Sequence, residues 1–127
     1  MSNIKQIIAI IVIISIIIIV DIIIGNNTKS VVSQMNDALE NIDNMIVNNE
    51  ETQEVASDLV IEWEEKEKML SYYMEHDELE KIGSNILLIQ KQIEIEALDD
   101  ARQSISETQF LFESISEKQS FNLENFF

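Results

Sequence analysis

The stretch that decides the fold is LEKIGSNILLIQKQI, residues 79–93. Its large apolar residues recur three and four positions apart, at Leu79, Ile82, Ile86, Ile89 and Ile93. This is the spacing of one face of an α-helix, because a helix completes a turn in about 3.6 residues. The stretch therefore predicts an amphipathic helix with one buried face, close to the seam pattern of packed helices.

Three other segments have apolar residues at the same spacing. The first contains Val32, Met35, Leu39, Ile42 and Ile46. The second contains Ala56, Leu59, Trp63, Leu70 and Tyr73, with Lys66 inside the stripe. The last contains Leu98, Ala101, Ile105, Phe112 and Ile115, with Thr108 inside the stripe. Each segment is therefore predicted to form a helix that buries one face.

The breaks between these segments are short, at about residues 48–49, 71–77 and 95–99. Short connections make consecutive helices antiparallel. The chain has no proline and only two glycines, which a strand-rich or loop-rich domain would need for its turns. The predicted fold is all-α, with an N-terminal transmembrane helix followed by an antiparallel up-and-down bundle of about four helices over residues 26–117.

Residues 4–24 read IKQIIAIIVIISIIIIVDIII and are apolar on every side of a helix. Twenty-one helical residues rise about 31 Å, which matches a hydrocarbon core of about 30 Å. Residues 1–25 are therefore predicted to be a transmembrane signal anchor that contacts membrane lipid through residues 4–24. A cleaved signal peptide is the alternative, but no small-residue cleavage pattern follows the apolar run. Whether the next helix continues the anchor or breaks at Gly25-Asn26-Asn27 stays open.

The orientation of the anchor rests on few charges. Lys5 and the terminal amine precede the apolar run, and Lys29 follows it. The positive-inside rule favours a cytoplasmic N-terminus and an extracytoplasmic C-terminal domain in a single-pass protein of the cell membrane. Asp21 lies about one turn from the outer end, where a carboxylate reaches headgroups and water. Contact with another helix through Asp21 is the alternative.

The chain is strongly acidic, with 24 Asp and Glu residues, 8 Lys and Arg residues and a formal net charge of −16. Residues 1–24 contain one cation, Lys5, and one anion, Asp21, so the remainder carries the whole net charge. Nucleic acid is excluded as a partner, because its binding depends on Lys and Arg at phosphates. An anionic lipid surface would also repel the domain. The absence of cysteine excludes disulfides, iron–sulfur clusters and thiolate zinc sites.

Catalytic motifs are missing from the sequence. It contains no GxxxxGK[ST], GxGxxG, HExxH or GxSxG pattern, and it has a single histidine. With 24 carboxylates, chance pairs are expected and carry no weight as acid–base sites. The sequence therefore predicts a protein that is not an enzyme and that binds no cofactor or metal.

The histidine lies in MEHDELEKIG, residues 74–83, where His76 and Glu80 have the four-residue spacing of metal ligands on a helix. A helix start is the favoured interpretation. Asp77 would act as N-cap, Glu80 would reach back as in a capping box, and Glu78 would favour the positive helix end. His76 would then lie just before the cap, near the end of the second helix of the bundle.

Aromatic residues have two expected roles. The only tryptophan, Trp63, lies in an apolar stripe and is predicted to be a core anchor, with ligand stacking as the alternative. All five phenylalanines lie from Phe110 onwards. Residues 118–127 are predicted to form an aromatic tail that folds back and caps the bundle. The alternative is an exposed peptide that docks on a partner or dips into the membrane.

Several of these residues together resemble a known family. They are Trp63, the His76-x-Glu78-Leu79-Glu80-x-Ile82 motif, and an ending with Leu111, Ile115, Glu117, Asn122, Leu123, Asn125, Phe126 and Phe127. This combination is similar to the bacterial domain-of-unknown-function family 4363, small proteins with an N-terminal membrane helix and a helical remainder. The resemblance covers nearly the whole chain. Ser116 stands where the family pattern has proline, which predicts that the last helix runs further.

The resemblance implies no assigned activity. Family members tend to occur in spore-forming anaerobes beside genes for another small membrane protein, which implies a membrane-protein partner. Together with the residues, it favours a non-catalytic acidic helical bundle that serves as a protein-interaction or accessory module, with a homo-oligomer as the other expected association. The alternative function is an extracytoplasmic ligand-sensing domain, and a metal-dependent or carboxylate hydrolase is a third.

Overall fold

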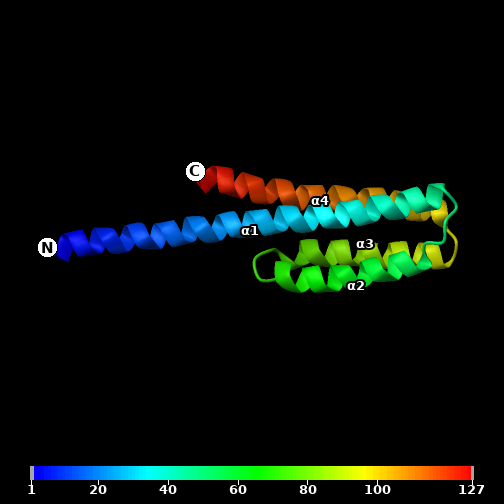
Figure 1. Cartoon of the computed structure of the whole chain (residues 1–127), viewed down its shortest axis with the longest axis horizontal. Helices are drawn as coiled ribbons and strands as arrows, with labels where there is room; N and C mark the ends of the chain where they lie inside the picture. The colour runs from blue at the N-terminus through cyan, green and yellow to red at the C-terminus, as the bar shows by residue number, and fades with distance from the viewer. Residues whose placement is uncertain (1, 127) are drawn as a thin grey trace.

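The computed structural model describes residues 2–126, without the side chains of residues 2 and 119–126. Four helices follow one another along the chain: α1 (Ser2–Val47), α2 (Gln53–Leu70), α3 (His76–Glu94) and α4 (Leu98–Phe126). They run alternately up and down, and each packs beside its neighbours in a closed ring, α1 against α2 and α4, and α3 against α2 and α4 (Figure 1). This confirms the predicted all-α up-and-down architecture.

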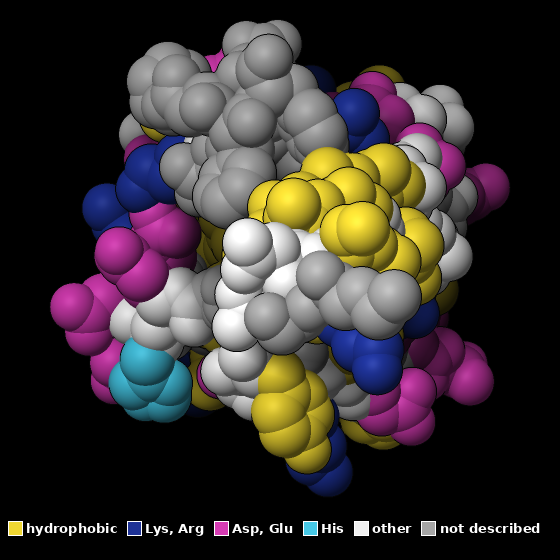
Figure 2. All heavy atoms as spheres, turned by 90° about the vertical axis from the view of Figure 1, so that its left-hand side faces the viewer, with side chains coloured by type: hydrophobic (Ala, Val, Ile, Leu, Met, Phe, Trp, Pro, Cys, Tyr) yellow, Lys and Arg dark blue, Asp and Glu magenta, His cyan; other side chains and the backbone are white. Residues whose placement is uncertain are grey.

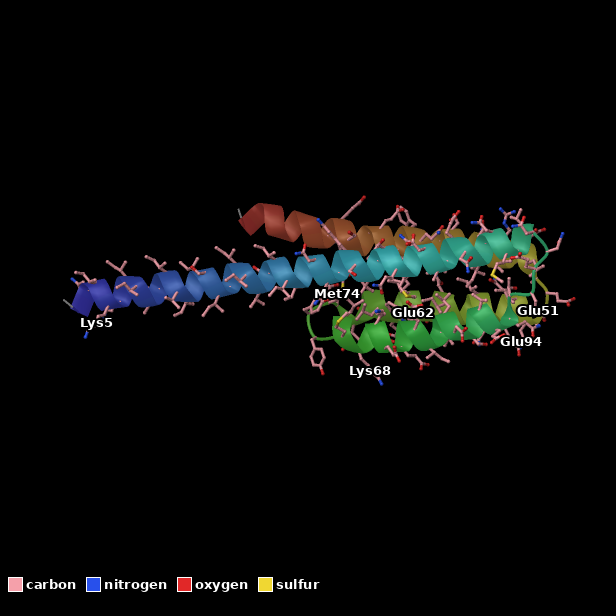
Figure 3. The ribbon with its side chains drawn as sticks, in the orientation of Figure 1. Lys5, Glu51, Glu62, Lys68, Met74 and Glu94 are labelled. Atoms are coloured by element: carbon pink, nitrogen blue, oxygen red, sulfur yellow. The ribbon has the colours of Figure 1, made fainter. Side chains whose placement is uncertain are left out.

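The helix α1 is continuous from the apolar run into the bundle. It has 46 residues, so it is about 69 Å long at 1.5 Å per residue. The Gly25-Asn26-Asn27 stretch lies inside it without a break, which answers the question that the sequence left open. The apolar run projects past the turn between α2 and α3, with its side chains spread around the helix (Figure 3). It is long and apolar enough to cross a membrane.

The core of the bundle consists of the predicted stripes. Nearly all their large apolar residues are buried, including the whole series from Leu79 to Ile93 on α3. Tyr73 and Leu98 are only partly buried, because Tyr73 lies in the turn after α2 and Leu98 is the first residue of α4. Thr108, the polar residue in the last stripe, is buried and its hydroxyl donates to the carbonyl of Ser104. A large apolar side chain contributes about 1.5–3 kcal/mol when buried, so these stripes hold the four helices together.

Two turns at the same end of the bundle close their helices without glycine. Asn49 and Glu96 have positive φ angles of 57° and 60°. After α1, the amide of Glu50 donates to the carbonyl of Met45; after α3, the amide of Ala97 donates to that of Gln92. These six-to-one bonds define Schellman caps, in which glycine is the usual left-handed residue. Glutamate at this position costs about 1–2 kcal/mol of backbone strain.

The start of α3 differs from the prediction. The helix begins at His76, and its N-cap is Glu75, which is extended and makes no side-chain capping bond. In the first backbone hydrogen bond of the helix, the amide of Leu79 donates to the carbonyl of Glu75. Asp77 therefore lies within the first turn and not before it. The predicted capping box with Asp77 as N-cap is therefore wrong. Asp77 and Glu78 still lie at the positive end of the helix, where carboxylates are favourable.

The end of α4 also differs from the prediction. The helix runs through Ser116 and on to Phe126, so its backbone does not fold back over the bundle at residue 118. Residues 98–126 contain neither proline nor glycine, and nothing in the local sequence ends the helix. Serine in place of proline at position 116 predicts a longer last helix, and this prediction is confirmed.

Candidate functional site

The MEHDELEKIG stretch lies at the end of the bundle from which the apolar half of α1 projects. Figure 2 looks onto this end, with apolar side chains gathered near the centre and charged side chains and the single histidine at the rim. His76 and Glu80 are both exposed. Within the part of the chain that the structure describes, no three His, Cys, Asp or Glu side chains are grouped as metal ligands. The two residues therefore lie on the surface of the first turns of α3.

Glu78 has a structural partner. It accepts an ion-paired hydrogen bond from the Nζ atom of Lys118, so it links the first turn of α3 to α4. That hydrogen bond, and then the charge of Glu78, raise the pKa of Lys118 above its ordinary value. A similar pair joins the other end of the bundle, where Arg102 donates to Asp43 at 2.8 Å and the pKa of Arg102 is raised. The two pairs connect α4 to α3 at one end of the bundle and to α1 at the other.

Trp63 is a core residue, as predicted from its place in the stripe. It is only 2% exposed, and its ring meets Phe112 edge to face with the centroids 5.5 Å apart. A Cβ atom at Gly83 would lie 3.0 Å from Trp63 Nε1, so the glycine lets the indole lie against α3. The indole N–H has no hydrogen-bond acceptor, and His76 is exposed and takes no part in this packing. The role of Gly83 was missed, although a glycine inside a helical stripe often marks a close approach.

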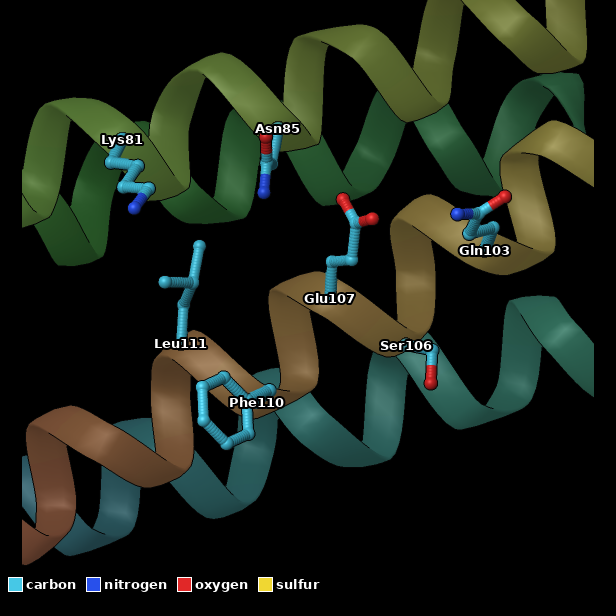
Figure 4. A pocket seen from close by; sticks show the side chains of 7 residues that line it. All are labelled: Lys81, Asn85, Gln103, Ser106, Glu107, Phe110 and Leu111. Atoms are coloured by element: carbon cyan, nitrogen blue, oxygen red, sulfur yellow. The ribbon is translucent and has the colours of Figure 1, made fainter.

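A groove runs between α3 and α4 on the outside of the bundle. It has a volume of about 540 Å³ and is lined by Lys81, Asn85, Gln103, Ser106, Glu107, Phe110 and Leu111. In Figure 4, Lys81 and Asn85 approach it from α3, while Glu107 and Leu111 approach it from α4. Phe110 is 67% exposed although it is aromatic. Helical periodicity does not predict this groove; the available signal was Phe110, a phenylalanine on the polar side of an amphipathic helix.

Comparison with known proteins gives one match to a family model, over residues 22–126, which covers most of the chain. The family is described as a domain of unknown function, DUF4363. The chain belongs to the DUF4363 family. This confirms the resemblance seen in the sequence motifs. Neither the curated proteins nor the solved structures contain a match to the chain.

The signature residues whose side chains the structure describes do not converge on one site. Trp63 is buried in the core, Glu78 pairs with Lys118, and His76 and Glu80 are exposed. The side chains of Asn122 and Asn125, and the whole of Phe127, lie outside the described part of the chain. Among the described signature residues, Trp63 and Glu78 make contacts between helices.

Proposed function

We propose that this DUF4363 protein is a single-pass protein of the cell membrane whose acidic bundle is a non-catalytic interaction or accessory module for a membrane partner. In this proposal residues 4–24 cross the bilayer, the N-terminus is cytoplasmic and the bundle is extracytoplasmic. The observation that carries it is the surface of α1. Isoleucines from Ile4 to Ile17 are exposed around the helix, whereas those of its second half are in the core. Bilayer hydrocarbon is the solvent in which such a surface is stable.

The groove between α3 and α4 is the face we assign to the partner. Phe110 is exposed beside it, and α3 also exposes Leu88. A few anchor residues provide most of the energy of a protein interface, and aromatic side chains are enriched at the interface core. The net charge of −16 disfavours a second copy of the chain and favours a partner segment with apolar anchors and basic residues around them.

Two observations support a non-catalytic role. The one histidine is exposed at the start of α3 and does not line the groove between α3 and α4. Glu78, a partly buried carboxylate two residues after His76, forms an ion pair with Lys118. Metal analysis of the purified full chain tests this part of the proposal. A stoichiometric metal ion that is lost in His76→Ala would contradict it.

Site-specific photo-crosslinking in intact membranes tests the interaction face. A benzophenone amino acid at position 110 should give one adduct with a membrane protein, whereas the same probe at position 61 should not. Ile61 is a matched control because it is also apolar and exposed but lies on α2. Phe110→Asp should abolish co-purification of the identified partner. An adduct of twice the mass of the chain would show self-association and contradict the assigned partner.

A thiol-labelling experiment tests the orientation. The chain contains no cysteine, so Ser84→Cys on the exposed side of α3 introduces a unique thiol. A membrane-impermeant maleimide should label it on intact cells. Labelling only after lysis would place the bundle in the cytoplasm and contradict the proposed orientation.

The size of the groove favours a second function, ligand sensing outside the cell. A volume of about 540 Å³ lies within the range of small-molecule sites, and the lining mixes amide, charged and aromatic side chains. In this second proposal the bundle binds the ligand and passes the signal to its membrane partner. Thermal-shift screening of the full chain with small molecules distinguishes the two functions. A ligand whose stabilising effect is lost in Asn85→Leu would favour sensing.

A further inference from the structure

One face of the apolar half of α1 is less exposed than the rest. Ile18, Asp21 and Ile24 are partly buried and Gly25 is fully buried. By contrast, Ile17, Ile19, Val20, Ile22 and Ile23 are all exposed. The four covered positions are three, three and one apart, so they lie on one side of the helix. Another part of the chain therefore covers this side of α1 within the segment proposed to cross the membrane.

The other helices can be placed along α1 by two contacts. The turn between α2 and α3 lies level with Thr28, because the hydroxyls of Thr28 and Tyr73 are 3.4 Å apart. The start of α3 lies level with Lys118 of α4, because Glu78 pairs with it. The end of α2 and the start of α3 therefore lie near residue 28 of α1, just after the apolar run of residues 4–24 has ended.

The last part of α4 continues beyond that point. From Lys118 it runs eight more residues to Phe126, which is a rise of about 12 Å. The same rise along α1 from Thr28 leads back to about residue 20, the level of Asp21. In Figure 1 these last turns lie next to α1, past the ends of α2 and α3, and the two helices are in contact along the bundle. The backbone of residues 119–126 therefore runs alongside α1 at the level of the covered positions.

The sequence of this extension suits the membrane boundary. Residues 119–126 read QSFNLENF, with two phenylalanines, a leucine and a single charged residue, Glu124. Elsewhere the bundle carries charges at most exposed positions. Aromatic residues are enriched where a membrane protein meets the headgroup layer. An intramembrane carboxylate such as Asp21 is costly against lipid, so a helix that lies over its side of α1 reduces that cost.

We propose that residues 119–126 of α4 enter the headgroup layer of the bilayer beside α1, so that the protein contacts lipid through two helices and α4 covers the lipid-facing side of Asp21. The inference rests on the proposed membrane span of α1. The lipid partner is zwitterionic, because the net charge of −16 opposes approach to an anionic surface.

Fluorescence quenching in phosphatidylcholine vesicles tests this inference on the full chain. Single cysteines from Asn125→Cys, Ser84→Cys and Ile17→Cys are labelled with the environment-sensitive fluorophore NBD. The label at position 125 should be quenched by nitroxide-bearing lipid and should resist iodide several-fold better than the label at position 84. Ser120→Cys gives a second reading of the same helix, and its protection should lie between those two.

The control positions separate the inference from the proposal on which it rests. If position 17 is protected but positions 120 and 125 are quenched by iodide as strongly as position 84, the inference is wrong and the span stands. If position 17 is itself open to iodide, the span and the inference are both wrong. Unfolding curves that match the unlabelled protein confirm that each labelled chain is folded.

Discussion

The two halves of α1 form one unbroken helix and use the same residue type in opposite ways. Ile10 in the first half is 55% exposed, whereas Ile42 in the second half is fully buried. Isoleucine content therefore does not decide burial in this chain. What differs is the pattern: residues 4–20 are apolar on nearly every side, and residues 28–47 have one apolar stripe among Asn, Asp, Gln and Glu. A stripe can be covered by three helices, but a fully apolar surface needs an apolar solvent.

The largest expected effect compares one substitution in the two halves. Ile42→Ala should lower the free energy of unfolding of the bundle by about 2–5 kcal/mol, because it removes buried methyl groups and leaves a cavity. Ile10→Ala should leave the unfolding of the bundle unchanged, since its side chain is outside the core. Denaturant unfolding in detergent, followed by the fluorescence of Trp63, measures both. Equal losses would contradict the separation of the two halves.

A lysine introduced into α1 should have the opposite pattern of effects: large in the apolar half and small on the exposed side of the second half. Ile13→Lys places an ammonium group in the middle of the apolar half, where insertion costs about 2.5–3.5 kcal/mol. The fraction of the chain that resists extraction by alkaline carbonate should fall. Asn41→Lys is the matched control, because Asn41 is exposed in the second half of the same helix. If the two variants were extracted equally, residues 4–24 would not be in the membrane.

The turn after α3 lies at the end of the bundle far from the apolar half of α1. A substitution in this turn is expected to stabilise the bundle, unlike those in the core. Glu96→Gly should stabilise the bundle by up to about 1 kcal/mol, because glycine adopts a positive φ without strain. Glu94→Gly, at the last residue of α3, should instead destabilise the bundle, by less than the cost of about 1 kcal/mol for glycine in a helix interior. Thermal unfolding monitored by circular dichroism compares the two. Destabilisation by Glu96→Gly would show that the strain at this position is absent.

The smallest expected effect concerns the Glu78–Lys118 ion pair, at the end of the bundle from which the apolar half of α1 projects. Glu78 raises the pKa of Lys118 in the folded chain. The ion pair therefore makes its full contribution to stability below the unfolded pKa of lysine, about 10.4. The contribution is lost as pH rises through the folded pKa. The difference in urea midpoint between the native chain and Lys118→Met should therefore be constant up to about pH 10 and shrink above it. A difference that does not change with pH would show that the pair contributes nothing measurable.

Local pattern predicted most of the fold. The stripe from Leu79 to Ile93, and its counterparts on the other helices, identify the core because burial of a helix face depends on spacing within the segment. The start of α3 was harder, since an N-cap depends on the backbone angles that the preceding turn imposes on Glu75. The aromatic composition after Phe110 suggested a separate tail, but without a helix breaker the backbone simply continues α4.

The candidate site was less predictable than the core. Trp63 was identified as a core anchor from its position in a stripe, but its contacts with Phe112 and Gly83 join three different helices. Phe110 lies outside every stripe, and its groove exists only because α3 packs beside α4. Such features depend on which helices are neighbours in space. Periodicity along one segment does not contain that information.

The most direct test is a nitroxide scan along α1, with single cysteines from Ile10 to Ile46 in the full chain reconstituted into phosphatidylcholine vesicles. The account predicts high oxygen accessibility with little periodicity up to about residue 17, and accessibility to a water-soluble nickel complex that recurs every 3.6 residues from about residue 28 onwards. Uniform access of the nickel complex to the first half would contradict it. Nickel accessibility without a period in the second half would equally contradict it.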